Sequence, residues 1–414
     1  MKKIFPFCLL AIGFGFAQEP MGNPPSPAPE ASPTGSASFD AVRGHAYNPF
    51  GITGAPSSVT DLVTTPSDIY GKKFFYVSPT DKLGYVAFDA LGGSTLLGLE
   101  LYGSSPISGN PNLVLGYATP GFGLALEYTI QKEWTKTTSD NTSLPGSTIV
   151  KTRETGPGDN IALHISLPLG SSTAYANMGW YTYGANYIET EGAPPDLSGL
   201  TPNQNGYVKF DNSTIRASAG MLGGAGNLNY DASLSVWRTG STLTSDLEYF
   251  SSMGDKAVSR DSRLGVGLNF DLSYAALKNE TGRVFVGSNN GLNVVFYDEV
   301  DSGDPQYAGG KRTSLNISPN ILGEVILADN WLAFAGATHG IHFRFGADNL
   351  INLRNENYSE TAIWQSATDA YIGLRYQKSN WAFEVQVSDN VFNNPFGGFN
   401  GSDMFASFGG FIYF

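Results

Sequence analysis

Residues 264–274 read Leu-Gly-Val-Gly-Leu-Asn-Phe-Asp-Leu-Ser-Tyr, so large apolar residues alternate with small or polar ones. Successive side chains of a β-strand point to opposite faces, and this stretch therefore predicts a strand with one apolar and one polar face. The same two-residue period recurs at 122–130, 161–169 and 381–388. Its repetition from about residue 94 onward predicts an all-β fold.

The lengths of the periodic segments and of their connections favour a membrane barrel over a soluble sandwich. Segments 258–277, 310–328 and 360–378 exceed the usual soluble strand of about 5–6 residues. Short connections fall at 120–121, 171, 223–225, 279, 329–330 and 379, and they alternate with long ones at 104–110, 138–146, 186–205, 242–257, 298–309, 346–359 and 391–403. Short turns on one rim and long loops on the other are typical of outer-membrane barrels.

This alternation predicts a transmembrane antiparallel up-and-down β-barrel of about 14 strands, with both ends on the same side. If residues 70–79 and 82–91 form an additional hairpin, the count becomes 16. We prefer 14 at this point, because the outer loop of that hairpin would be only Thr80-Asp81.

The composition agrees with a barrel and excludes several other classes. Glycine (50), phenylalanine (26) and tyrosine (21) are abundant, whereas charged residues make up only 15%. A formal net charge of −13 argues against nucleic-acid binding, which needs a basic surface. The only cysteine is Cys8, and the four histidines have no ligand-like spacing, so we expect no metal site and no cofactor.

The amino-terminal part divides by composition into three segments. Residues 1–17 combine Lys2 and Lys3 with a short apolar run and end on Gly-Phe-Ala, which predicts a secretory signal peptide cleaved after Ala17. Residues 18–37 are rich in proline and predict a disordered tether. Residues 38–93 are expected to form a plug or an extra hairpin, and residues 94–414 the transmembrane barrel.

The strand phase predicts which charges line the lumen. The candidates on the polar faces are Glu100, Glu127, Arg216, Asp231, Asp271, Glu324, Arg344, Arg375 and Glu384. Six acidic residues against three basic ones would mildly favour cations in a water-filled pore. The alternative is that these charges pair across the lumen and brace the wall. No histidine, serine and acid grouping has a recognisable catalytic spacing, so no enzyme is predicted.

The carboxyl-terminal residues Phe408 to Phe414 read Phe-Gly-Gly-Phe-Ile-Tyr-Phe. An apolar last strand that ends on phenylalanine resembles the carboxyl-terminal signature of bacterial outer-membrane β-barrel proteins. The resemblance implies that Phe408, Ile412 and Phe414 are read by the barrel assembly machinery. It also implies that the mature chain lies in the outer membrane, in contact with its lipid. Tyr413 departs from strict alternation of apolar and polar residues.

Three functions fit this class. The first is a porin-like channel for passive diffusion of small hydrophilic solutes. The second is a transporter of hydrophobic compounds, because residues 38–93 have the size of the plug in the long-chain fatty-acid transporter family. That family has 14 strands and an Asn-Pro-Ala plug motif; the nearest runs here are Asn48-Pro49-Phe50 and Thr65-Pro66-Ser67, so no binding residues carry over. The third is a structural or adhesive surface barrel that uses loops 186–205 and 391–403. The oligomeric state is left open.

Overall fold

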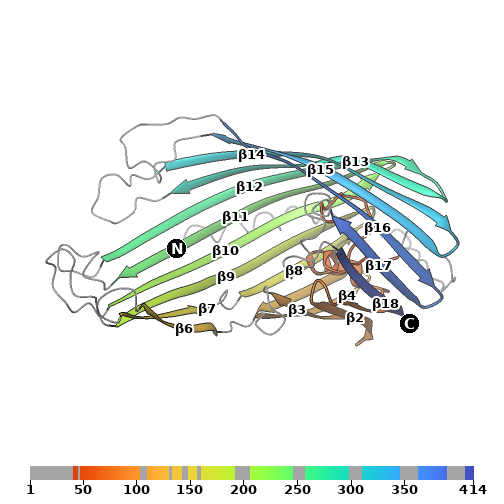
Figure 1. Ribbon diagram of the computed structural model, residues 1–414. Helices are drawn as coiled ribbons and strands as arrows, with labels where there is room; N and C mark the ends of the chain where they lie inside the picture. The colour runs from red at the N-terminus through yellow and green to blue at the C-terminus, as the bar shows by residue number, and fades with distance from the viewer. Residues whose placement is uncertain are drawn as a thin grey trace. The chain divides into compact units, whose positions relative to one another are not determined.

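One antiparallel β-sheet closes on itself to form the wall of the molecule in the computed structural model (Figure 1). The structure describes residues 41–44, 47–102, 110–129, 133–141, 148–155, 160–191, 206–245, 257–297, 310–345, 362–388 and 406–414. Among these residues, no helix is long and apolar enough to cross a membrane.

Two short helices precede the strands. The elements are α2 (Asp61–Thr64), η1 (Pro66–Ile69), β1 (Phe74–Ser78), β2 (Leu83–Ala90), β3 (Gly93–Tyr102), β4 (Asn110–Thr119), β5 (Phe122–Thr129), β6 (Glu133–Asn141), β7 (Thr148–Thr155), β8 (Asn160–Leu169), β9 (Ser172–Glu191), β10 (Gly206–Ala225), β11 (Leu228–Ser245), β12 (Ala257–Lys278), β13 (Gly282–Tyr297), β14 (Gly310–Ala328), β15 (Trp331–Phe345), β16 (Ala362–Lys378), β17 (Trp381–Ser388) and β18 (Ala406–Tyr413). Strands β9 to β16 are the long ones, with 15 to 22 residues each.

The barrel closes where β1 pairs with β18, from Phe74↔Tyr413 to Val77↔Gly410. Strand β1 also pairs with β2, and β5 pairs directly with β8. Strands β6 and β7 pair with each other, and β7 pairs with β9 beyond the part of β9 that pairs with β8. The β6–β7 hairpin thus extends the β5–β8 hairpin, and the described strands form a closed barrel of sixteen. Each of strands β1 to β5 and β8 to β18 thus pairs with a strand on both sides, which is what a sheet needs in lipid.

The sixteen-strand alternative is therefore the one that the chain adopts. The preference for fourteen strands rested on the short connection between β1 and β2, and side chains close this connection. The Ser78 hydroxyl donates to Asp81 Oδ2 at 2.6 Å, and the Thr80 hydroxyl accepts a hydrogen bond from the Phe408 N–H at 3.0 Å. Because its polar groups are hydrogen-bonded in this way, the hairpin tip does not require a longer loop.

The outer face of the barrel is apolar, as the two-residue period predicts. On β4, Leu113 and Leu115 are 45% and 52% exposed, whereas Val114 between them is 3% exposed and faces the interior. At one rim, the rings of Trp331, Tyr376 and Trp381 follow one another with centroids 4.8 and 5.2 Å apart. Aromatic side chains in such a girdle prefer the boundary between lipid and water.

The strands that meet at this rim are joined by short turns, and we call it the short-turn rim. The turns lie at 91–92, 120–121, 170–171, 226–227, 279–281, 329–330 and 379–380. The turn expected at 223–225 is displaced, because Gly223 and Gly224 continue β10 and pair with Tyr230 and Asn229. Gly226, with φ +63°, makes the turn instead, since glycine adopts positive φ without strain.

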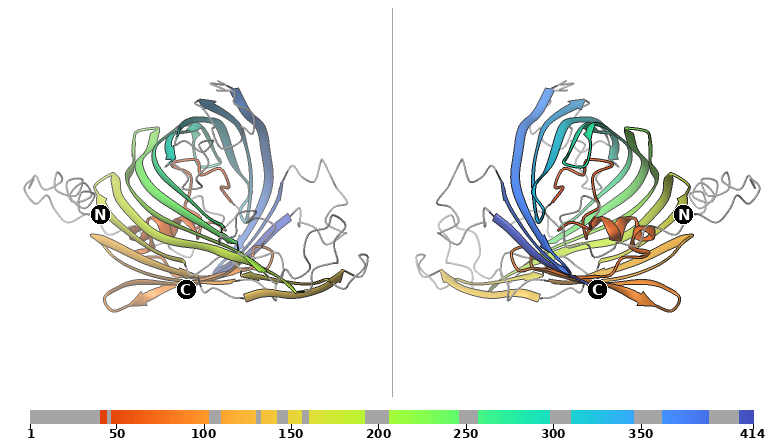
Figure 2. Two further views of the ribbon diagram at one scale, coloured as in Figure 1. Left: turned by 90° about the vertical axis from the view of Figure 1, so that its left-hand side faces the viewer. Right: turned by 90° about the vertical axis from the view of Figure 1, so that its right-hand side faces the viewer.

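The described residues between 41 and 73 lie inside the barrel, and we call them the plug. Figure 2 shows this segment, in red and orange, within the ring of strands. The segment 38–93 thus divides at Phe74: the described residues before it occupy the lumen, and β1 and β2 after it belong to the wall. Buried apolar residues form two clusters, and each joins plug residues to wall residues.

Candidate functional site

The plug contacts opposite parts of the wall near the short-turn rim. Its amino-terminal residues meet β14, β16 and β17, and its helices pack on β3, β4, β5 and β8. We treat the plug and the lumen wall around it as the candidate functional site, because anything that passes through the barrel must pass this level.

The first contact, which we call the charged dock, is built on buried ions. Arg43 Nη2 lies 3.0 Å from Glu324 Oε1, and both side chains are 0% exposed. The guanidinium of Arg43 also lies 5.0 Å from the ring centroid of Tyr47. A buried ion requires a partner of opposite charge, so this pair fixes where the plug begins.

A second ion pair completes the charged dock. Arg375 and Glu384 are cross-strand partners on β16 and β17 and form an ion pair. Arg375 Nη1 donates to the Val42 carbonyl at 3.3 Å, and the Gly44 N–H donates to Glu384 Oε2 at 2.6 Å. A Cβ at position 44 would overlap this same carboxylate, so only glycine fits there.

The second contact, which we call the glycine cradle, is apolar. Leu62 and Ile69 of the plug are fully buried in a cluster with Leu96, Val114 and Ala125 of the wall. Gly116 makes room for Ile69, whose Cδ1 lies 2.7 Å from the position that a Cβ would take.

Gly123 makes room for the plug backbone in the same cradle. A Cβ at position 123 would overlap backbone atoms of Pro66 and Ser67. The Ser67 N–H donates to the Ser166 hydroxyl of β8 at 2.7 Å. The cradle therefore recognises the shape of η1 rather than its charge.

Between these contacts the plug forms a loop that holds its own shape. The Asn48 side chain accepts from the Ile52 N–H at 3.1 Å and donates to the Ile52 carbonyl at 3.2 Å. Tyr47 and Ile52 are buried against Leu322, Leu332 and other residues of the long strands. Asn48 of the run Asn48-Pro49-Phe50 thus shapes a turn inside the plug.

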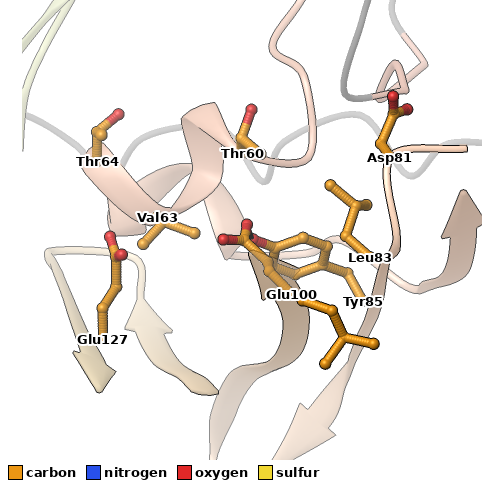
Figure 3. Close-up of a pocket in the computed structure, with 9 residues that line it drawn as sticks. Thr60, Val63, Thr64, Asp81, Leu83, Tyr85, Glu100 and Glu127 are labelled. Carbon is orange, nitrogen blue, oxygen red and sulfur yellow. Dashed lines mark hydrogen bonds between the residues drawn. The ribbon is translucent and has the colours of Figure 1, made fainter. Parts of the chain in front are cut away.

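A cavity of about 320 Å³ lies between α2 and the wall (Figure 3). Its lining comes from the plug, from the β1–β2 tip and from β2, β3 and β5: Thr60, Val63, Thr64, Asp81, Leu83, Tyr85, Glu100, Leu101 and Glu127. Figure 3 shows the carboxylates of Glu100 and Glu127 on the side of the cavity that faces α2.

Glu100 and Glu127 are joined by neutral hydrogen-bond donors. Asn112 donates to Glu100 Oε2 at 3.0 Å and to Glu127 Oε2 at 3.4 Å, and Tyr85 donates to Glu100. His164 Nε2 lies 2.8 Å from Glu127 Oε1, and its Nδ1 lies 3.0 Å from Asn177 Oδ1. These two predicted residues therefore share one polar network.

The remaining predicted charges lie on the long strands. Asp231 and Asp271 are cross-strand partners on β11 and β12. Tyr175 donates to Asp231 at 2.7 Å, and the Asn290 N–H donates to Asp271 at 2.9 Å. Arg216 is exposed on β10, and Arg344 is half-buried on β15 opposite Ser314.

The structure thus distributes the nine candidates over separate places. Glu324, Arg375 and Glu384 meet at the charged dock, where ion pairs brace plug and wall. Glu100 and Glu127 meet at the cavity, and Asp231 faces Asp271. Arg216 and Arg344 belong to none of these groups among the described residues.

The sequence reasoning missed Arg43, the partner of Glu324. Arg43 is the only arginine in the first 150 residues, and this isolation, next to acidic lumen positions, is the signal that could have found it. It also left His164 without a partner, although Glu127 and Asn177 contact it. No sequence spacing relates these residues, because strand register brings them together.

Tyr413 is not an irregularity of the last strand. Its side chain faces inward with Phe411, and its hydroxyl accepts a hydrogen bond from Arg375. Ile412 and Phe414 are 50% and 61% exposed on the outer side. Phe408 packs with its ring 6.3 Å from that of Phe383. That Phe408, Ile412 and Phe414 act as an assembly signal stays a prediction.

Several other predictions fall outside the described residues. Loop 391–403 lies wholly outside them, and so do residues 192–205 of the loop expected at 186–205. The signal peptide 1–17 and the tether 18–37 lie outside them too. Within the described part of the chain, no three histidine, cysteine or acidic residues group in a way that could hold a metal ion.

Comparison with known proteins gives similar solved structures only. The sequence matches no protein-family model and no curated protein sequence. The translocator domain of the autotransporter NalP from Neisseria meningitidis is 15% identical over 71% of this chain and 88% of that chain, with a TM-score of 0.33. The toluene transporter TbuX of Ralstonia pickettii is 9% identical over 82% and 87%, with a TM-score of 0.30. OmpT of Vibrio cholerae is 11% identical over 82% and 94%, with a TM-score of 0.26.

The class of the protein follows from its own architecture. The antiparallel wall is closed, has an even number of strands, and joins them by short turns at one rim. Its outer face is apolar and carries an aromatic girdle, and its inner face carries the charged and amide side chains. These are the features of barrels that span bacterial outer membranes. The protein is a closed antiparallel β-barrel with the architecture of outer-membrane barrels, and its described lumen contains an amino-terminal plug.

Proposed function

We propose that the protein is an outer-membrane channel for passive diffusion of small hydrophilic solutes, narrowed by its plug. The observation that carries this proposal is the lining of the long strands. Asn229 bonds to Ser273 at 3.3 Å, Asn269 to Ser233 at 3.4 Å, and Asn320 to Asn289 at 2.5 Å. These side chains come from four neighbouring strands, β11 to β14.

An amide and hydroxyl lining supports passage of polar solutes. Such groups replace the hydrogen bonds that a sugar or hydrated ion loses when it leaves bulk water, and they offer an apolar ligand little contact area. Glycine on the same face makes room for larger polar and aromatic neighbours: a Cβ at Gly265 would overlap Trp237, and a Cβ at Gly267 would overlap Ser235 and Asn293.

The charges along the proposed path favour cations weakly. Glu324, Arg375 and Glu384 are engaged at the charged dock. The other candidates are four acidic residues, Glu100, Glu127, Asp231 and Asp271, against Arg216 and Arg344. We expect a modest cation preference, because opposite charge lowers the barrier for entry.

A transporter of hydrophobic compounds is the second candidate, and the plug itself favours it. A plugged lumen limits free diffusion, as a transporter that binds its ligand requires. Against it stands the polar lining of β11 to β14, because sites for apolar ligands are lined mainly by hydrophobic and aromatic side chains, whereas amides and hydroxyls are prominent here. In either case the role is transport and not catalysis, and assembly in the outer membrane by the barrel assembly machinery is part of the proposal.

The test is solute flux through liposomes and planar bilayers. We expect swelling by small sugars that decreases with sugar size. Replacing residues 41–72 by a glycine-serine linker of equal length should raise single-channel conductance, since β1 begins only at Phe74 and the wall is retained. An intact heat-modifiable band on a gel confirms that the variant barrel has folded.

Other outcomes would favour the other functions. Absence of sugar flux from wild type and linker variant, with saturable binding of a fatty acid or alkane, would replace the channel by the hydrophobic transporter. If neither sugar flux nor binding of a fatty acid or alkane is observed, and the protein binds polysaccharide or cells, a structural or adhesive role would be favoured over the channel. Equal conductance of wild type and linker variant would contradict the narrowing role of the plug.

A further inference from the structure

Residues 47–57 lie between two plug segments that touch each other, and we call them the flap loop. The Arg43 N–H donates to the Ser57 carbonyl at 3.1 Å, and the Val59 N–H donates to the Arg43 carbonyl at 3.0 Å. Arg43 and Ser58 thereby form a parallel bridge, which is the neck of the loop. A loop of this form is a self-contained unit, because its ends stay together whatever its body does.

The neck is held firmly to the wall. Arg43 pairs with Glu324 at 3.0 Å, and Arg375 holds the Val42 carbonyl at 3.3 Å. On the other side of the neck, the glycine cradle holds η1 through Ser67 and Ile69. The residues on either side of the flap loop are therefore anchored independently, and Tyr47 of the body adds a ring contact to Arg43.

The body of the flap loop is attached by apolar packing around Tyr47, Phe50 and Ile52 and by hydrogen bonds from the wall. Asn289 Nδ2 donates to the Phe50 carbonyl at 2.7 Å, and the Ser273 hydroxyl donates to the Thr53 carbonyl. No strand pairing joins residues 47–57 to the wall among the residues described. Release of the body would break these hydrogen bonds, uncover Tyr47 and Ile52, and separate the Tyr47 ring from Arg43. The backbone hydrogen bonds of the neck and the Arg43–Glu324 ion pair would remain.

We infer that the flap loop opens and closes as one body on the Arg43–Ser58 neck and gates the lumen, while residues 58–73 stay fixed. The part of this inference that gives the flap loop a gating role rests on the proposed channel function. The Asn48–Ile52 hydrogen bonds keep the loop preformed, so the motion needs no refolding of its tip. Burial of Tyr47 and Ile52, 1% and 2% exposed, favours the closed state.

Opening exposes wall groups that water can satisfy. Asn289 and Ser273, which hold the tip, are polar and line the lumen beside Asn320 and Asn229. In a wetted lumen, water takes over their hydrogen bonds. Burial of Tyr47 and Ile52 thus determines the fraction of molecules in which the flap loop is closed. The hydrogen bonds from the wall determine where the tip of the loop binds.

Engineered disulfides test the gate directly. Cys8 is the only native cysteine, so in a Cys8→Ser background two pairs can be compared. Thr53→Cys with Ser273→Cys ties the flap tip to the wall, since these residues touch. Ser67→Cys with Ser166→Cys is the matched control that ties the fixed part, where the same kind of contact spans 2.7 Å.

Conductance under oxidising and reducing conditions separates the two pairs. We expect the oxidised Thr53–Ser273 pair to stay at the lowest conductance level and to regain transitions on reduction. The oxidised Ser67–Ser166 pair should gate like wild type. Unchanged gating with the flap tied, or gating lost when only the fixed part is tied, overturns the inference.

Hydrogen exchange tests the motion without any solute flux. Backbone amides of 50–57 should exchange at least about tenfold faster than those of 62–70 in the folded barrel. Ile52→Ala should raise exchange in 47–57 by at least about tenfold and leave 62–70 unchanged. Equal exchange of the two segments, or a rise in both, overturns the inference. If the exchange difference is present but sugars do not pass, the channel proposal fails and the motion stands.

Discussion

The charged dock and the glycine cradle hold the same plug by opposite means. At the charged dock, two buried arginines and two buried carboxylates fix residues 42–44. At the glycine cradle, wall glycines admit Ile69 and the backbone of η1 to within packing distance. Charge fixes one end of the plug, and shape fixes the other.

The difference predicts how each contact fails. A buried ion is stable only with its partner, so losing one residue of the charged dock leaves the other charge desolvated. A packed surface fails instead when volume is added, because interiors are close-packed and relax only in part. Substitutions that remove a group should therefore harm the charged dock most, and substitutions that add one should harm the cradle.

The largest effect is expected for Arg43→Met, which leaves Glu324 buried without its charged partner. Breaking a buried pair in this way costs about 3–5 kcal/mol. We expect the urea concentration at which a protease reaches the plug to fall strongly, while the barrel band on a gel is unchanged. The double variant Arg43→Met with Glu324→Leu should recover most of the loss. A single variant as stable as wild type would refute the charged dock as an anchor.

A smaller effect is expected for Gly123→Ala, which adds one methyl group to the cradle. The new Cβ would overlap backbone atoms of Pro66 and Ser67, and backbone cannot swing aside as a side chain does. Overpacking of this kind costs about 1–3 kcal/mol. Faster hydrogen exchange in 62–70 measures it. Gly121→Ala is the matched control, since nothing lies within 4 Å of its Cβ position, and it should leave exchange unchanged.

The two contacts also differ in how far the sequence could predict them. The wall could be predicted, because the two-residue period is local: Leu264 to Tyr274 predicted the strand and its outer face. The same phase predicted Glu324, Arg375 and Glu384 as inward. The partner of Glu324 could not be found this way, since Arg43 lies in an irregular segment without a period and is 281 residues from Glu324.

The preferred strand count of fourteen and the interpretation of Tyr413 were wrong for a related reason. Strand β1 has five residues, too few for a clear period, and its place depends on pairing with β18 at the far end of the chain. Tyr413 was read as an exception to the alternation, although its ring faces inward like that of Phe411. A tyrosine in an inward position implies a polar partner, and here it is Arg375.

Tyr413 links the charged dock to the closure of the barrel, and Tyr413→Phe should have a moderate effect. It removes one hydrogen bond from Arg375, which keeps Glu384 and Gln377 as partners. We expect a loss of about 1 kcal/mol. It should appear as a lower unfolding temperature of the heat-modifiable band. Tyr376→Phe, at the aromatic girdle, is the control; an equal loss there would show that the Arg375 contact is not the cause.

The smallest effect concerns pH and acts on the cradle side only. Burial raises the pKa of the Asp68 carboxyl above its ordinary value of 3.8, although the Thr65 hydroxyl, which donates at 3.0 Å, and nearby Lys72 oppose this shift. A carboxyl whose pKa is higher in the folded state stabilises that state below its unfolded pKa. This stability is lost as pH rises through the folded pKa.

Asp68→Asn removes this dependence and keeps the acceptor for Thr65. We therefore expect the variant plug to resist protease at neutral pH slightly better than wild type, and the advantage to shrink toward pH 4. An advantage that grows on acidification would mean that Asp68 is stabilised in its ionised form. The direction of this pH effect distinguishes the two contacts. The carboxylates of the charged dock are paired with arginine, whereas burial disfavours the ionised form of Asp68. Only the cradle side should therefore loosen as the Asp68 carboxyl ionises.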